Sequence, residues 1–304
     1  MNITQPQQAK CDDRQILTKG PDPRDWIASA LPGGWALHGF HFFVNWTVNP
    51  TALGKEIWLT RLIHFSTGEN PQTVNEASIL ELFKASADLS TFESLARFCG
   101  KHGQVVRVVF LPEISTAALN DQSPVWSIFY IGDGSLVASK LSMNWLKTEI
   151  QKHSGGPVWM GAKGLIYGTS AVECMLSNTN SLYPGDVDAV IVDHQNSARC
   201  VIEYKKHTIN DEIGNHLVSK YYPKPDGRKY QRLQLLVSHY RKYDPVPFIV
   251  LYFSTRTPTI RLQELGDILP DKVVISRDSG DLDISGRSNS EIANMVVAWL
   301  KVTK

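Results

Sequence analysis

The chain has 304 residues, of which 42% are hydrophobic, and a formal net charge of +1. This length exceeds the usual size of one domain, and the composition excludes a disordered chain and favours a globular protein. The near-zero net charge identifies no class of partner by itself, so a charged binding surface would have to be local.

The N-terminal segment and the cysteines bear on location. MNITQPQQAKCDDRQ is polar and mixed in charge, unlike a secretory signal or a transit peptide. No apolar run approaches the roughly 20 residues that a membrane span needs. The cysteines are widely spaced, which argues against a zinc ribbon or a disulfide scaffold and favours a reducing compartment; they are Cys11, Cys99, Cys174 and Cys200. We therefore expect a soluble, cytoplasmic protein with no membrane partner.

The N-terminal half predicts a mixed α/β fold. Apolar periodicity indicates strands over 40–48, 56–65, 105–111 and 125–131, and helices over 77–87, 91–102 and 143–151. Seven of the eight tryptophans precede residue 160; they could stack on bases, but aromatic residues mostly fill cores, and we favour the core interpretation. A linker-like segment at 152–157 predicts two domains, one over 1–152 and a second over 153–304. We expect the first domain to select the substrate or the partner.

The functional signal lies between Tyr183 and His207. Two apolar runs, 187–192 and 200–204, flank the polar segment 194–198, and this pattern predicts a β-hairpin that turns near Asn196. The two strands carry acidic residues and a lysine, which are unusual on a strand with neighbours on both faces.

The predicted hairpin brings these charged residues together. Glu203 and Lys205 share one face because side chains alternate along a strand. A register that pairs Asp188 with either of them places all three together, with Cβ atoms roughly 5 Å apart across the strands. Buried charges must be paired or bind a metal. The cluster is therefore either a structural ion-pair network or a site for a hard cation such as Mg²⁺.

The motif resembles that of the PD-(D/E)xK nuclease superfamily. That signature has an acid at the start of one strand and Glu-x-Lys on the next, and here GDVDAV precedes VIEYKKH, which matches Asp188, Glu203 and Lys205. GDVD is similar to the Gly-x-Ile/Val-Asp form of the RecB-like branch, and Asp186 is the alternative first acid. The resemblance covers residues 155–255, roughly a third of the chain.

The resemblance implies a restriction-endonuclease-like mixed sheet flanked by helices in the C-terminal half. Its catalytic residues would be Asp188, Glu203 and Lys205. Mg²⁺ or Mn²⁺ would be held by Asp188 and Glu203, together with the Tyr204 backbone carbonyl. Glu173, on the preceding helix, is either a further metal ligand or a solvent-facing glutamate.

The segment after the motif predicts a helix over 228–241 and a buried strand over 248–253. Helix, hairpin, helix and strand follow one another in the order that the family core requires. The helix supplies three auxiliary candidates, although their spacing departs from the RecB-like pattern: Gln231, Gln234 and Tyr240.

A local excess of positive charge adjoins the motif. From Arg199 to Tyr243 there are ten Lys and Arg against four Asp and Glu. This excess suits a path for a phosphate backbone, although a solvated helix face and a charged loop would also explain it. The candidate backbone contacts are Lys206, Arg228, Lys229 and Arg232.

We therefore expect a metal-dependent hydrolase that cleaves phosphodiester bonds of nucleic acid, with DNA favoured over RNA, acting as a homodimer or with a partner subunit. The leading alternative is a non-catalytic nucleic-acid-binding subunit that retains the nuclease fold. In a third interpretation, the acids form a structural ion-pair network in an unrelated α/β protein.

Overall fold

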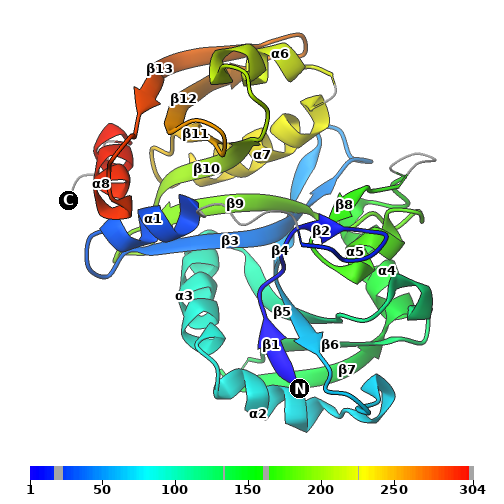
Figure 1. The fold of residues 1–304 in the computed structure, drawn as a ribbon. Coiled ribbons are helices and arrows are strands. Elements are labelled where there is room, and N and C mark those ends of the chain that lie inside the picture. The colour runs from blue at the N-terminus through cyan, green and yellow to red at the C-terminus, as the bar shows by residue number, and fades with distance from the viewer. Residues whose placement is uncertain (17–22, 133, 160–163, 225, 301–304) are drawn as a thin grey trace. The chain divides into compact units, whose positions relative to one another are not determined.

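The computed structural model describes residues 1–16, 23–132, 134–159, 164–224 and 226–300 (Figure 1). The fold class is α/β, as predicted, and the chain forms two compact units. The first unit comprises Met1–Thr18 and Phe40–Gly185, and the second comprises Lys19–Gly39 and Asp186–Lys304.

This division differs from the predicted boundary at residues 152 and 153. Helix α4 (Met143–Ser154) does end there, at Gly155 in the left-handed conformation with φ 81°. The chain then stays in the first unit, where Val158 forms a bridge with Ser181. A glycine in the left-handed conformation ends a helix. The glycine in the linker-like segment therefore marks the end of α4 and not the boundary of a domain.

The first unit is built on a mixed sheet. Strand β4 pairs antiparallel with β3 and parallel with β5, and β5, β6 and β7 continue the sheet with antiparallel pairs. A short strand, β1, pairs with the end of β4. The strands are β1 (Asn2–Thr4), β3 (Ala36–Asn45), β4 (Ala52–His64), β5 (Val105–Pro112), β6 (Pro124–Tyr130) and β7 (Leu136–Ser142).

Helices cover both faces of this sheet. Helices α2 (Glu76–Lys84) and α3 (Asp88–Lys101) lie over one face, where Phe83 contacts Phe92 and Phe110. Helix α4 and helix α5 (Ala171–Leu176) pack on the other face in a core that includes Trp58.

The tryptophans largely follow the core interpretation. Trp58 and Trp126 are fully buried. Trp35, Trp46 and Trp145 are half-buried, and Trp159 departs from the core interpretation because 64% of its surface is exposed.

The second unit contains the predicted hairpin. Strands β9 (Gly185–Val192) and β10 (Ala198–His207) pair antiparallel, and Asn196 takes a positive φ of 57° in the turn. Strand β11 (Phe248–Ser254) pairs parallel with β10. Helix α7 (Gly227–Tyr240) makes the crossover between these two parallel strands.

Apolar layers cover the two faces of the sheet within the second unit. Helices α1 (Pro23–Ala30) and α8 (Asn289–Trp299) pack on the face that carries Cys200 and Ile202. Helix α7 covers the opposite face, where Tyr230 contacts Phe248. The short helix α6 (Val218–Tyr221) precedes α7 in the chain.

Two further antiparallel strands, β12 (Thr259–Ile268) and β13 (Val273–Asp283), follow β11 in the sheet. Strand β13 carries three acids, Asp278, Asp281 and Asp283. Arg261 pairs with Asp278 at 2.8 Å and Asp281 at 3.1 Å. The partner arginine on β12 lets the acids occupy a strand.

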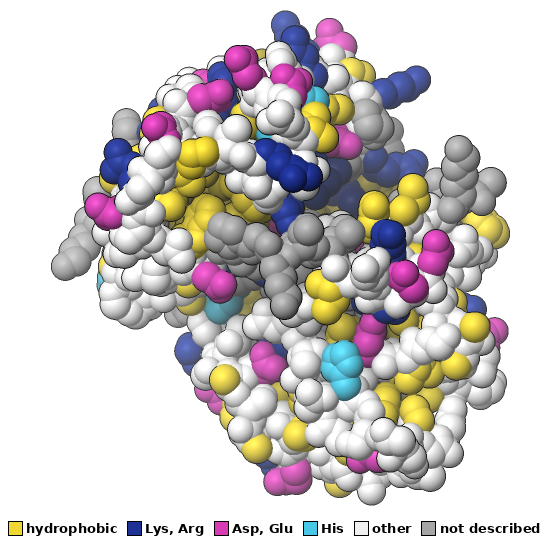
Figure 2. All heavy atoms as spheres, in the orientation of Figure 1, with side chains coloured by type: hydrophobic (Ala, Val, Ile, Leu, Met, Phe, Trp, Pro, Cys, Tyr) yellow, Lys and Arg dark blue, Asp and Glu magenta, His cyan; other side chains and the backbone are white. Residues whose placement is uncertain are grey.

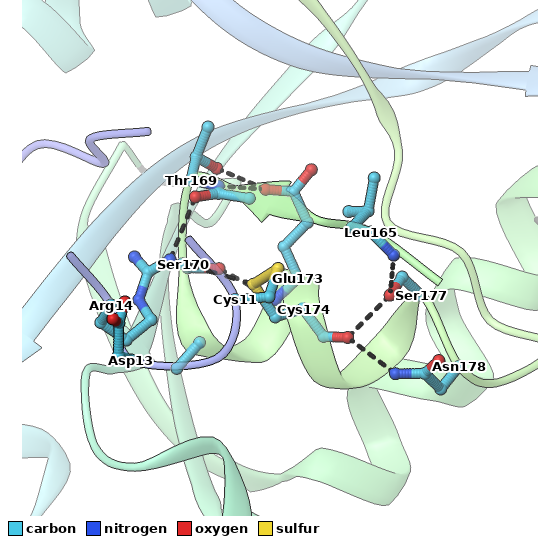
Figure 3. The surroundings of a disulfide bond; sticks show 12 residues. Cys11, Asp13, Arg14, Leu165, Thr169, Ser170, Glu173, Cys174, Ser177 and Asn178 are labelled. Atoms are coloured by element: carbon cyan, nitrogen blue, oxygen red, sulfur yellow. Dashed lines mark hydrogen bonds between the residues drawn. A yellow bond between two sulfur atoms is a disulfide. The ribbon is translucent and has the colours of Figure 1, made fainter. Parts of the chain in front are cut away.

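A disulfide joins Cys11 to Cys174 (Figure 3). This pairing corrects the prediction drawn from cysteine spacing, and with it the argument for a reducing compartment. The two cysteines lie 163 residues apart but belong to the same unit. Short strands β2 (Ala9–Lys10) and β8 (Tyr167–Gly168) pair beside them. Among the described residues, no helix has both the length and the apolarity required to cross a membrane.

Candidate functional site

The acids on β9 and β10 meet where the hairpin strands begin to separate. The last backbone pair joins Ile202 to Ala189, so Asp188 follows it on the side of Glu203. Asp188 Oδ2 accepts a hydrogen bond of 2.7 Å from the Tyr204 backbone N–H. The Asp188 carboxylate thus accepts a hydrogen bond that a backbone carbonyl of β9 would accept in a regular pair of strands. This hydrogen bond orients the carboxylate toward β10.

Glu203 is the most buried member of the cluster, with 1% of its side chain exposed. Lys229, from α7, forms an ion pair with Glu203 Oε1. Lys205 Nζ lies 3.9 Å from the same oxygen and 2.9 Å from Asp226 Oδ2. Among the described residues, neither carboxylate oxygen of Glu203 has a hydrogen-bond partner, and Oε1 is held by its ion pairs alone. One carboxylate oxygen therefore faces the two ammonium groups and the other is unsatisfied.

The charged residues of the cluster shift one another's pKa values. Burial raises the pKa of Asp188 well above its usual range, repulsion by Glu203 adds to the rise, and Lys229 opposes it. Burial alone would lower the pKa of Lys229, but Glu203, Asp186 and Asp188 together raise it above its ordinary value. The acids and lysines therefore act on one another as one electrostatic cluster.

The backbone groups of Tyr204 face β9. The N–H and C=O of one strand residue point to the same side of the strand, and the Tyr204 N–H points to Asp188. Its carbonyl therefore points toward β9 as well.

The donor set fits a hard divalent cation. Mg²⁺ takes one or two protein carboxylates and fills its remaining positions with water and phosphate oxygens. Asp188, Glu203 and the Tyr204 carbonyl could supply such ligands. Among the described residues, no group of three or more His, Cys, Asp and Glu side chains is arranged to hold a metal. Any metal here would thus depend on ligands beyond the protein's side chains.

Asp186, the alternative first acid, is an exposed residue two positions before Asp188 on β9. The two residues point to the same face, since side chains alternate along a strand. Asp186 also helps to raise the pKa of Lys229, after Glu203. Asp186 thus borders the cluster, while Asp188 is the acid that contacts β10.

Glu173 belongs to the first unit, whereas the other predicted metal ligands belong to the second. Its carboxylate accepts hydrogen bonds from the Thr169 backbone N–H at 2.5 Å and the Thr169 hydroxyl at 2.8 Å (Figure 3). The Ser170 hydroxyl in turn accepts a hydrogen bond from the Glu173 N–H. The contacts of Glu173 therefore support the start of α5.

The auxiliary candidates occupy different positions on α7. Gln231 is exposed, and Gln234 is half-buried with an Oε1 that has no hydrogen-bond partner among the described residues. Tyr240 is fully buried at the far end of the helix, about 15 Å from Tyr230 at the helical rise per residue. The structure therefore places Tyr240 away from the acids.

The predicted backbone contacts separate into two groups. Lys206 and Arg228 are exposed, whereas Lys229 and Arg232 are half-buried. Figure 2 shows Lys and Arg side chains gathered on the visible face of the second unit. Exposed lysines and arginines suit phosphate contacts, but Lys229 already contacts Glu203.

Sequence reasoning missed the roles of three residues near the start of α7. Asp226 pairs with Lys205, Lys229 pairs with Glu203, and the Tyr230 ring lies beneath Lys205, 5.5 Å from Nζ to ring centroid. A signal was present for Lys229, because it precedes Leu233 by four residues and so continues the apolar stripe of the helix. A lysine in such a stripe requires an acidic partner.

No protein-family model matches the chain, and comparison with curated proteins finds no similar sequence.

Proposed function

We propose that the protein is a metal-dependent nuclease that hydrolyses phosphodiester bonds, with DNA as the favoured polymer. The observation that carries this proposal is the meeting of Asp188, Glu203 and Lys205 at the end of the β9–β10 pair. The resemblance of their motif to the PD-(D/E)xK superfamily supports it. So does the β10–α7–β11 arrangement, which continues the order expected of that family core.

Each residue has a role that follows from its position. Asp188, Glu203 and the Tyr204 carbonyl would hold Mg²⁺ or Mn²⁺. When bound, such a cation polarises water and neutralises charge on a phosphate. The Lys205 ammonium, held by Asp226, would orient the attacking water and offset charge as the water oxygen bonds to phosphorus and one P–O ester bond breaks. The attacking water would release its proton to solvent, and the leaving oxygen would take a proton from solvent water.

The test is cleavage of labelled single-stranded DNA, duplex DNA and RNA with Mg²⁺, Mn²⁺ or EDTA. We expect cleavage by the wild-type protein with either metal and none with EDTA. Asp188→Asn, Glu203→Gln and Lys205→Ala should each lower the rate by at least about 100-fold, the scale of general acid–base and electrostatic contributions.

A matched control removes a lysine elsewhere in the second unit. Lys242→Ala alters an exposed residue beyond the end of α7, and it should cleave at the wild-type rate. Full activity in the purified Lys205→Ala protein would refute the assignment of the site. The preferred substrate would also separate DNA from RNA.

A second candidate is a nucleic-acid-binding subunit without hydrolytic activity. It is favoured by the direct ion pair between Lys229 and Glu203, which neutralises a carboxylate that the nuclease proposal needs as a ligand. Gel retardation without cleavage under any metal condition would select this function. If the protein neither cleaves nor retards nucleic acid, the cluster is a structural ion-pair network.

A further inference from the structure

The inference concerns Lys229 and rests on the proposed function. Both lysines of the cluster approach the same oxygen, Glu203 Oε1, but they are held differently. Lys205 has a second acidic partner, because its Nζ lies 2.9 Å from Asp226. Among the described residues, Glu203 is the only ion-pair partner of Lys229. A cation that binds Glu203 must therefore compete chiefly with Lys229.

We propose that Lys229 is a resident counter-ion of Glu203, which a divalent cation must displace and which then becomes available to a phosphate of the nucleic acid. The buried carboxylate needs a positive partner at all times, because an unpaired buried charge is costly. In the free protein Lys229 supplies that partner. This competition weakens metal binding when no substrate is present.

The position of Lys229 gives the displaced ammonium a second use. Its side chain is 31% exposed, so it reaches both the buried Glu203 and the solvent. Arg232 follows it by three residues, which places both cations on neighbouring positions of one helix face. A phosphate bound at this face would replace Glu203 as the negatively charged partner of Lys229. Metal and nucleic acid should therefore bind cooperatively, and each should increase the affinity for the other by the same factor.

Calorimetric titration with Mg²⁺ tests the competition between Lys229 and the cation, and it does not depend on cleavage. Wild type and Lys229→Met would be titrated alone and with a single-stranded phosphorothioate oligonucleotide, whose backbone resists hydrolysis. We expect Lys229→Met to bind Mg²⁺ about tenfold more tightly than wild type in the absence of oligonucleotide, within the usual range of coupling between sites. The oligonucleotide should raise the Mg²⁺ affinity of wild type about tenfold and that of Lys229→Met much less.

Three variants separate this effect from general ones. Lys242→Met removes the same charge from an exposed position beyond the end of α7 and should bind Mg²⁺ as wild type does. Lys229→Arg keeps the counter-ion and should retain weak metal binding. Lys229→Gln keeps a hydrogen-bond donor for Glu203, so it provides a folded variant without the charge if Lys229→Met does not fold.

The outcomes distinguish the inference from the function on which it rests. Equal Mg²⁺ affinity in wild type and in a folded Lys229→Met or Lys229→Gln protein would overturn the role of Lys229 and leave the nuclease proposal standing. If the folded wild type binds no Mg²⁺ with or without oligonucleotide and cleaves nothing, the metal site itself is refuted.

Discussion

At the scale of single residues, the two carboxylates of the site take their partners from neighbouring elements. Glu203 takes its counter-ion from α7, and Asp188 takes a hydrogen bond from the facing strand. Glu56, in the first unit, follows the same rule. It accepts hydrogen bonds from Trp58 Nε1 at 2.6 Å and Arg107 Nε at 2.8 Å.

The Glu56 partners predict a loss of stability in acid. Burial acts to raise the pKa of Glu56, but bonds from His153, Trp58 and Arg107 overcome it and lower the pKa to about 2 from an ordinary 4.5. Glu56 therefore contributes stability above pH 4.5, and this contribution is lost as the pH falls toward 2. The shift corresponds to about 3 kcal/mol.

Urea denaturation at pH 6 and pH 3 measures this contribution. Glu56→Gln, which cannot ionise, should lose less stability between these pH values than wild type does. Equal losses in the two proteins would show that the Glu56 ion pairs contribute nothing to the acid sensitivity.

At the scale of elements, the site depends on a close approach of two backbones in the second unit. A Cβ added at Gly39, on β3, would lie 2.7 Å from the backbone carbonyl oxygen of Asp188. Gly39→Ala must therefore push β9 away or distort β3. We expect it to lower the free energy of unfolding by about 1–3 kcal/mol, the usual cost of overpacking.

Chemical denaturation of Gly39→Ala beside Gly33→Ala checks this expectation. Gly33 has no neighbouring atom within 4 Å of an added Cβ, so its substitution should leave stability nearly unchanged. Equal free energies of unfolding in the two variants would mean that β9 moves to accommodate the added methyl group without loss of stability.

The elements also show what local sequence can predict. The hairpin was predictable because alternation and turn composition are local properties, and the same signals gave α7 and β11. The ion pairs of Lys229 and Asp226 were not predicted, since they depend on how a crossover helix lies over the sheet. The strand position of Asp278 likewise depends on Arg261, a partner 17 residues away.

At the scale of the whole molecule, long-range links were the hardest to predict. Cysteine spacing carries no information on a pair separated by 163 residues, and helix-end glycines resemble linkers. The two units are also discontinuous in sequence, because residues 19–39 belong with the C-terminal part of the chain. No single boundary in the sequence therefore separates the two units.

The disulfide predicts a redox-dependent stability confined to the first unit. Cys11→Ser with Cys174→Ser removes a link that closes a long loop of the unfolded chain. We expect this to destabilise the first unit by about 2–4 kcal/mol. Thermal unfolding with and without a reducing agent measures the change, and mass spectrometry of unreduced peptides checks the link. A melting curve that is insensitive to reductant would contradict the prediction.

The packing of α1 on α8 has a consequence for biosynthesis. Helix α1 leaves the ribosome first among the helices of its unit, and α8 leaves last. The complete core around Trp26 and Ile27 can therefore form only after the whole intervening chain has been synthesised. The first unit can fold in that interval, because its segments are all made by Gly185. The nascent chain thus carries α1, with Trp26 and Ile27 not yet buried in their complete core, between two segments of a unit that can already fold.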